Sequence, residues 1–277
     1  MKKILVPTDF SETAKRAFYY AAQFAARTGG ATIKVVHAFM PEVASEYHVL
    51  PPIDEYLKAR EEQMTDFMQE VLSNLNGITD SLDYESDILV GFAADEISAM
   101  SNEYDLIVMG STGQGGIIGK LFGSVSSGVT QRAHCPVLLV PKDVDFKNID
   151  HILYACSCDE IEDDVIDDLK AFNAAFNANI HFIHVQSDKE EDFDKTKAEI
   201  FEELFDDGNP TFSFEFSEIK GGNVSDSLTD YAEGNNIDLI VMVTRHRNMW
   251  EQLFHRSETK RMALGSHYPL LVFHADD

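Results

Sequence analysis

Short apolar runs alternate along the chain with longer segments in which apolar residues recur at helical spacing. In the first half, these runs predict strands at residues 3–6, 32–38, 84–90, 106–109 and 137–140. The runs lack polar alternation, which is typical of strands buried on both faces of a parallel sheet. Between them, residues 11–27 predict a helix capped by Ser11, and residues 53–75 predict a long amphipathic helix.

Strands that alternate with helices predict right-handed crossovers between parallel strands. We therefore expect an α/β protein in which each half is a doubly wound, three-layer sandwich around a parallel sheet. Sheets of this kind bind their ligands where the strands end, at the carboxyl edge.

The second half of the chain repeats landmarks of the first half in the same order. The sequence DLIVM occurs at residues 105–109 and again at 238–242, and IKVVHAF at Ile33 is echoed by IHFIHVQ at Ile180. Similar echoes link GFAADEI with GNVSDSL and CPVLLV with YPLLVF. The repeat predicts two tandem domains, residues 1–142 and 147–277, joined by a short polar link.

Composition and charge narrow the classes of function. The chain is 44% apolar and 25% charged, and no apolar run approaches the roughly 18 residues of a membrane span. The N-terminus does not resemble a secretory signal, so we expect a cytoplasmic protein without a membrane partner. The net charge is −26, which disfavours nucleic acid as a partner. The three cysteines have neither disulfide nor zinc spacing and are expected to be small buried residues.

A glycine-rich segment, MGSTGQGGIIGKLFGSVSS, follows the fourth predicted strand. Glycines let backbone N–H groups approach an anion, and Ser124 and Ser126 lie where the next helix begins, so the segment favours phosphate binding over a merely flexible loop. The spacing excludes two other phosphate motifs. A Walker A motif would need glycine at Gln114 and a hydroxyl at Leu121, and a dinucleotide motif meets Ile118 in its last place.

Gly110, Gly113, Gly123 and Ser124 match the pattern G-x2-G-x9-G-[ST], and VPTDFSETA begins at Val6. In these features the chain resembles the nucleotide-binding members of the universal stress protein family. The resemblance implies a five-stranded sheet of the adenine nucleotide alpha hydrolase-like type, ATP as ligand, and frequent dimerisation through the last strand. It also implies a nucleotide site that comprises Pro7, Thr8, Asp9, Ala38, Met109, Gly110, Gly113, Gly123, Ser124, Val125 and Ser126.

Four polar residues near the predicted strand ends and the glycine segment each have more than one interpretation. Asp9 is equally well explained as an N-terminal cap of the first helix. His37 and His184 follow apolar strands without a nearby ligand set, which favours core or crevice-wall histidines over metal ligands or catalytic groups. Lys120 either neutralises phosphate charge or is simply solvated.

The second half lacks the glycine pattern. Val243 stands at the position of Gly110 and His246 at that of Gly113, while His255 and Arg256 replace Gly123 and Ser124. Because side chains at these positions block close backbone approach, we expect one nucleotide per chain. A basic cluster, Arg245 to Arg261, is interpreted either as pairing with acidic residues or as a different anion site.

These observations favour an ATP-binding stress or regulatory protein with its nucleotide in the N-terminal domain. The alternatives are a slow Mg²⁺-dependent ATP hydrolase, with Asp9 near the metal and Lys120 near the phosphates, and an interaction scaffold that uses no nucleotide. The sequence leaves enzymatic activity undecided, because it identifies no Walker B acid or arginine finger. We expect the two domains of one chain to pair, with further homodimerisation open.

Overall fold

A computed structural model describes most of the chain in two compact units. The described residues up to Lys142 form the first unit, and the described residues from Asp143 form the second. Among the described residues, no helix is long and apolar enough to cross a membrane. The described residues are 1–41, 52–75, 77, 82–113, 123–157, 163–186, 193–206, 208–220, 224–245 and 267–275.

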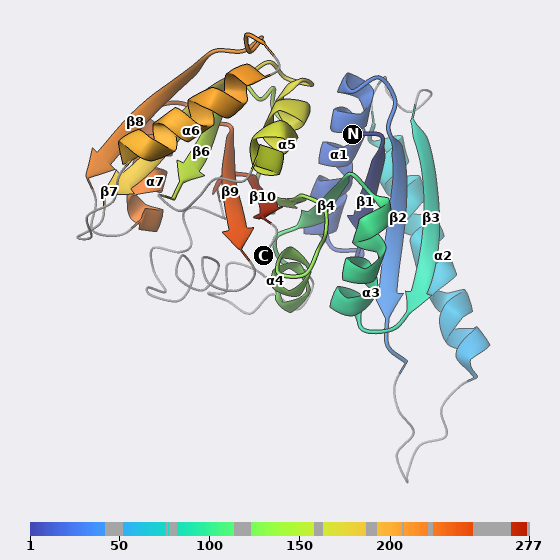
Figure 1. The fold of residues 1–277 in the computed structure, drawn as a ribbon. Helices are drawn as coiled ribbons and strands as arrows, with labels where there is room; N and C mark the ends of the chain where they lie inside the picture. The colour runs from blue at the N-terminus through green and yellow to red at the C-terminus, as the bar shows by residue number, and fades with distance from the viewer. Residues whose placement is uncertain are drawn as a thin grey trace. The chain divides into compact units, whose positions relative to one another are not determined.

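The first unit is a five-stranded parallel sheet with the order β3-β2-β1-β4-β5, drawn from blue to green in Figure 1. Helices α1 and α2 contact each other, as do α3 and α4. Its strands are β1 (Lys3–Pro7), β2 (Thr32–Phe39), β3 (Asp83–Val90), β4 (Leu106–Gly110) and β5 (Val137–Val140). Its helices are α1 (Glu12–Arg27), α2 (Ile53–Ser73), α3 (Ala93–Met100), the 3-10 turn η2 (Ser101–Glu103) and α4 (Ser124–Thr130).

These elements confirm the strands and the two helices that the apolar pattern predicts, with ends shifted by one or two residues. Strand β1 lies at the centre between β2 and β4, and its residues Ile4, Leu5 and Val6 are fully buried. An apolar run without alternation suits this position, since both faces of the central strand are covered.

The second unit repeats this sheet with the order β10-β9-β6-β7-β8, drawn from yellow to red in Figure 1. The fold class predicted from the sequence is confirmed. The strands of this unit are β6 (His151–Cys156), β7 (Asn179–Gln186), β8 (Phe214–Lys220), β9 (Leu239–Arg245) and β10 (Leu270–Ala275). Its described helices are α5 (Asp163–Asn173), α6 (Phe193–Asp206) and α7 (Val224–Gly234).

The aspartate of the repeated DLIVM sequence has the same role in both units. Asp105 accepts hydrogen bonds from the backbone N–H groups of Lys2 and Lys3, at the start of β1. Asp238 accepts them from Asp150 and His151, at the start of β6. Partial burial raises the pKa of Asp105, but the two backbone donors, together with the positive charges of the N-terminus and Lys3, leave it below its ordinary value. The repeat thus preserves a side chain that aligns neighbouring strands.

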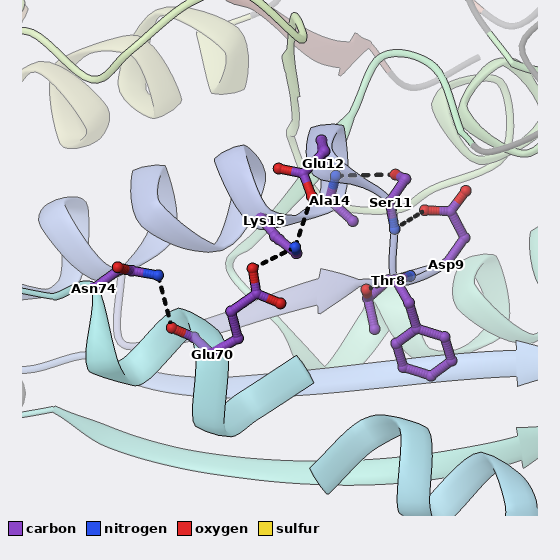
Figure 2. A network of polar contacts seen from close by, with 9 residues as sticks. Thr8, Asp9, Ser11, Glu12, Ala14, Lys15, Glu70 and Asn74 are labelled. Carbon is purple, nitrogen blue, oxygen red and sulfur yellow. Dashed lines mark hydrogen bonds and ion pairs between the residues drawn. The ribbon is translucent and has the colours of Figure 1, made fainter. Parts of the chain in front are cut away.

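Helix α1 begins as the sequence predicts, with Ser11 as its N-cap. The Ser11 hydroxyl accepts a hydrogen bond from the Ala14 N–H at 3.2 Å (Figure 2). One turn later, Lys15 bridges Glu12 of α1 at 2.6 Å and Glu70 of α2 at 2.5 Å. These contacts hold the first turn of α1 in place, directly after the carboxyl end of β1.

We expect Ser11→Ala to lower the free energy of unfolding by about 1 kcal/mol, because an N–H group at the helix start loses its acceptor. Equilibrium urea unfolding measures this loss. Ser11→Asn is the matched control, since asparagine is an equally good cap and should retain most of the stability. Equal losses in both variants would contradict a capping role.

Candidate functional site

The carboxyl edge of the first sheet brings together residues from three adjacent strands. Pro7 ends β1, and Thr8 follows it directly. Ala38 lies near the end of β2 on one side, and Met109 and Gly110 end β4 on the other. Pro7, Thr8 and Met109 are buried, whereas Ala38 is half-buried. The sheet order therefore gathers the predicted residues of β1, β2 and β4 at one edge.

The turn after β1 is organised by its own side chains. The Thr8 hydroxyl accepts a hydrogen bond from the Phe10 N–H at 3.0 Å, and Asp9 Oδ1 accepts one from the Ser11 N–H at 3.1 Å. Phe10 has a φ of +63°, which is a strained conformation for a side chain of this size. Figure 2 shows Asp9 turned toward the start of α1. The N-cap of α1 is therefore Ser11 and not Asp9. Asp9 instead holds the backbone of Ser11 in place through its carboxylate.

His37 joins β2 to this turn. Its Nδ1 donates a hydrogen bond to the Thr8 carbonyl at 2.8 Å, and its ring lies 4.3 Å from the ring of Phe10, centroid to centroid. Burial lowers the pKa of His37, against the opposing effect of the Thr8 carbonyl. A neutral ring at pH 7 suits this arrangement, because Nδ1 then carries the only ring proton.

The second unit retains this histidine contact. His184 of β7 has its Nδ1 3.3 Å from the carbonyl oxygen of Cys156, and its ring stacks on Phe193 at 4.9 Å. The contact persists in a unit that has lost the glycine pattern, so it supports the fold. Among the described residues, no cluster of three or more His, Cys, Asp or Glu side chains suits a metal ion.

The two ends of the glycine-rich segment are tied together at Ser111. The Ser111 carbonyl accepts hydrogen bonds from the Gly123 N–H at 2.9 Å and from the Ser126 hydroxyl at 2.7 Å. The Ser111 N–H in turn donates to the Val140 carbonyl of β5 at 2.9 Å. This closed neck, which we define as Ser111, Gly123 and Ser126, brings the first and last parts of the motif together beside β4.

The three motif glycines differ in what a β-carbon at each position would meet. A β-carbon on Gly110 would lie 2.7 Å from Thr13 Cγ2 of α1, so this glycine permits close packing of strand on helix. On Gly113 it would lie 2.3 Å from Asp9 Oδ2, which places Gly113 against the turn after β1. On Gly123 it would be 3.6 Å from its nearest neighbours, the Gly113 nitrogen and the Ser126 hydroxyl, an ordinary contact. Of these three glycines, only Gly123 has room for a side chain when no ligand is bound.

The structure thus brings most of the predicted site residues to one edge, with a changed role for Ser126. Its buried hydroxyl donates to backbone carbonyls of Ser111 and Gly123, so it has no proton for a phosphate oxygen while the neck is closed. Ser124 and Val125 form the first turn of α4. Gly115, Gly116, Gly119 and Lys120 lie outside the described residues.

Sequence reasoning missed Thr13 and Ser111. Thr13 is an ordinary position in an amphipathic helix, and only its packing against Gly110 shows why a glycine is needed there. Ser111 directly follows the first motif glycine, but its role rests on its backbone, which a sequence pattern does not report.

The corresponding edge of the second unit has a different chemistry. Ala155 and Cys156 end β6 and Ser157 follows them, all half-buried, and Val243 of β9 is half-buried where Gly110 stands in the first unit. Cys135 is buried as expected, whereas Cys156 is half-buried and its thiol donates to the Tyr154 carbonyl at 3.8 Å. The side chain of Arg245 and the rest of the basic cluster to Arg261 lie outside the described residues.

The fold and this edge define the class of the protein: tandem doubly wound α/β units, the first with a glycine motif after its fourth strand. The model of the Universal stress protein family matches residues 1–141 and 148–274. The chain therefore belongs to the universal stress protein family, as the sequence motifs predict, and carries two copies of the family's domain.

Individual relatives agree with this assignment. A universal stress protein of Thermus aquaticus is 38% identical over 143 residues, covering 50% of this chain and 98% of the relative. One from Methanocaldococcus jannaschii is 37% identical over 149 residues, covering 51% of this chain and 82% of the relative. A solved universal stress protein of Archaeoglobus fulgidus is similar over 99% of this chain and 97% of its own, with 21% identity and a TM-score of 0.73. This last likeness concerns the fold.

Proposed function

We propose that the first unit binds ATP at its carboxyl edge and that the bound nucleotide regulates the protein in a stress response. The observation that carries the proposal is the closed neck. Hydrogen bonds to Ser111 hold Gly123 beside Gly113, although nine residues lie between these two motif glycines in the chain. A glycine pattern that serves only as a loop has no need for this closure.

Each group at the edge has a role in the proposed complex. Pro7, Thr8 and Asp9 face adenine and ribose, while Ala38 and Met109 flank the base. Gly110 shapes the end of β4, and the backbone N–H groups of Gly113, Ser124, Val125 and Ser126 supply donors for ribose and phosphate oxygens. The Gly123 N–H is held by the Ser111 carbonyl, so Gly123 contributes a position without a side chain, where the phosphates can approach. The first N–H groups of a helix have no acceptor within that helix, which leaves those of α4 available. Ser126 contributes its N–H group, since its hydroxyl closes the neck.

We expect isothermal titration of the full chain with ATP to show a single binding site per chain. The second unit has Val243 in place of Gly110, and its β-carbon prevents the close strand-to-helix approach seen in the first unit. The titration is done with and without Mg²⁺, which also shows whether the metal strengthens binding. Two sites of similar affinity, or no binding under either condition, would contradict the proposal.

A second measurement identifies the ligand. Nucleotide extracted from the purified full chain is separated by chromatography, and its base and phosphate number are determined. We expect an adenine nucleotide. A guanine nucleotide would overturn the adenine assignment but not the proposed phosphate site, because the closed neck supports phosphate binding and does not select the base.

A further inference from the structure

The second unit contains a buried histidine, His181, at the amino end of its sheet, away from the edge described above. His181 lies near the start of β7 and is only 4% exposed. Polar partners reach it from three other elements and from its own strand. They are His151 of β6, Glu215 of β8, Tyr231 of α7 and Asn179 of β7.

The contacts of His181 assign its proton. Nδ1 lies 2.6 Å from Glu215 Oε1 and 3.0 Å from the Tyr231 hydroxyl, which itself donates to Glu215 at 3.3 Å. An ionised carboxylate only accepts hydrogen bonds, so Nδ1 carries the proton. Nε2 lies 3.0 Å from the amide nitrogen of Asn179, a donor, and must therefore accept. His151 Nδ1, also 3.0 Å from Nε2, completes the set as a second donor.

The neutral form of His181 therefore satisfies every one of these contacts, whereas the doubly protonated ring does not. A proton on Nε2 would face the Asn179 amide and would require His151 to give up its own Nδ1 proton. Burial lowers the pKa of His181, Glu215 opposes this effect, and a positive charge on His151 adds to it, with a net lowering. The carboxylate of Asp238, which also lies beside His151, accepts from the His151 backbone N–H.

The first unit has a permanent cation at the same place. Lys34 of β2 pairs in register with Glu85 of β3, as His181 of β7 pairs with Glu215 of β8. The Lys34 ammonium lies 3.1 Å from Glu85 and 3.5 Å from Asp87. Burial lowers the pKa of Lys34, but its carboxylate partners raise it further, so the lysine stays charged throughout the neutral range. The second unit therefore has a histidine, which titrates near neutral pH, where the first unit has a lysine with a fixed charge.

We propose that the cluster of His181, His151, Glu215, Tyr231 and Asn179 is an acid-sensitive switch that loosens the second unit when the surrounding pH falls. The sign follows from linkage. A histidine whose pKa is lowered by folding binds protons more readily in the unfolded state, so its stabilising effect is complete well above about pH 6.5 and is lost as the pH falls below it. Weakened pairing of β7 with β6 and β8 follows.

Hydrogen exchange of the full chain, compared between about pH 7.5 and about pH 5.5 and corrected for the intrinsic exchange rate, tests this proposal. Over this range, a histidine that protonates only in the open state increases the opening equilibrium about tenfold. We expect peptides from β7 and β8 to show an acid-induced increase that is about tenfold smaller in His181→Gln. The glutamine amide is able to donate to Glu215 and accept from His151 but does not titrate.

Two controls make the result specific. Peptides from β2 and β3, whose own acid response includes His37, should respond alike in His181→Gln and the unmodified chain. Glu215→Gln removes the one partner that favours the protonated ring, and this half-exposed position tolerates an amide. We expect Glu215→Gln to retain or enlarge the acid response, which keeps the test decisive if His181→Gln does not fold. An unchanged response in His181→Gln, or a response abolished by Glu215→Gln, overturns the proposal.

Discussion

The Gly123→Asp variant is expected to bind ATP about a hundredfold more weakly than the unmodified chain, while keeping its thermal stability. Gly123 is the N-cap of α4 with an extended backbone (φ −68°, ψ 162°), and a β-carbon there makes contacts no closer than 3.6 Å. Aspartate is a favoured N-cap residue, so the fold should accept it. Two like charges about 4 Å apart repel by roughly 1 to 4 kcal/mol, and each 1.4 kcal/mol is a factor of ten in affinity.

Gly123→Asn is the matched control for this variant. Asparagine has nearly the same shape and is an equally good cap but carries no charge. We expect it to weaken ATP binding much less than aspartate does, in isothermal titrations of both variants. If Gly123→Asp and Gly123→Asn bind ATP as tightly as the unmodified chain, the phosphates do not lie at Gly123. A scaffold that uses no nucleotide would show no ATP binding in any of the three proteins.

The Gly110→Ala variant is expected to lose about 1 to 3 kcal/mol of unfolding free energy, the range for overpacking in a well-packed core. The added β-carbon meets Thr13 Cγ2 at 2.7 Å, Thr13 Cβ at 3.1 Å and the Thr13 backbone at 3.2 Å. Because Thr13 is buried in α1, strand and helix must separate. Equilibrium urea unfolding measures the loss, and hydrogen exchange of β4 and α1 peptides locates it in the first unit.

Thr13→Ala provides the test of cause. It removes the closest of the three contacts, so the double variant should recover part of the stability that Gly110→Ala loses. No recovery in the double variant, or no loss in Gly110→Ala, would show that Gly110 is not required for packing. If the double variant recovers stability in part but does not recover ATP binding, the remaining displacement of β4 relative to α1 is enough to disturb the nucleotide site at the carboxyl edge of the sheet.

Much of the fold follows from short-range information in the sequence. Residues 4–6 and 137–140 are apolar throughout because both faces of a parallel strand are covered, and Ser11 caps α1 because a hydroxyl satisfies a helix N–H group locally. The repeat of Asp105 as Asp238 is likewise visible in the sequence, although their shared task, alignment of neighbouring strands, rests on long-range hydrogen bonds. Signals of this kind are visible to anyone reading the sequence.

The candidate site was predictable in position but not in detail. The spacing of Gly110, Gly113 and Gly123 locates the motif. The sequence does not show, however, that these three glycines have different surroundings in the folded protein. Whether a β-carbon at a glycine meets a helix, a carboxylate or open space depends on which distant segment packs against it. For the same reason the sequence does not show that Ser126 closes the neck with its hydroxyl.

The sequence by itself determined the tandem repeat, the parallel strands, the cap of α1 and membership in the universal stress protein family. Only the tertiary structure decided that Thr13 requires Gly110, that Ser111 ties the ends of the glycine motif, and that His181 is buried among His151, Glu215 and Tyr231. Periodicity and capping are properties of neighbours along the chain. Contacts between residues far apart in sequence depend on strand order and register, which exist only once the sheet has formed.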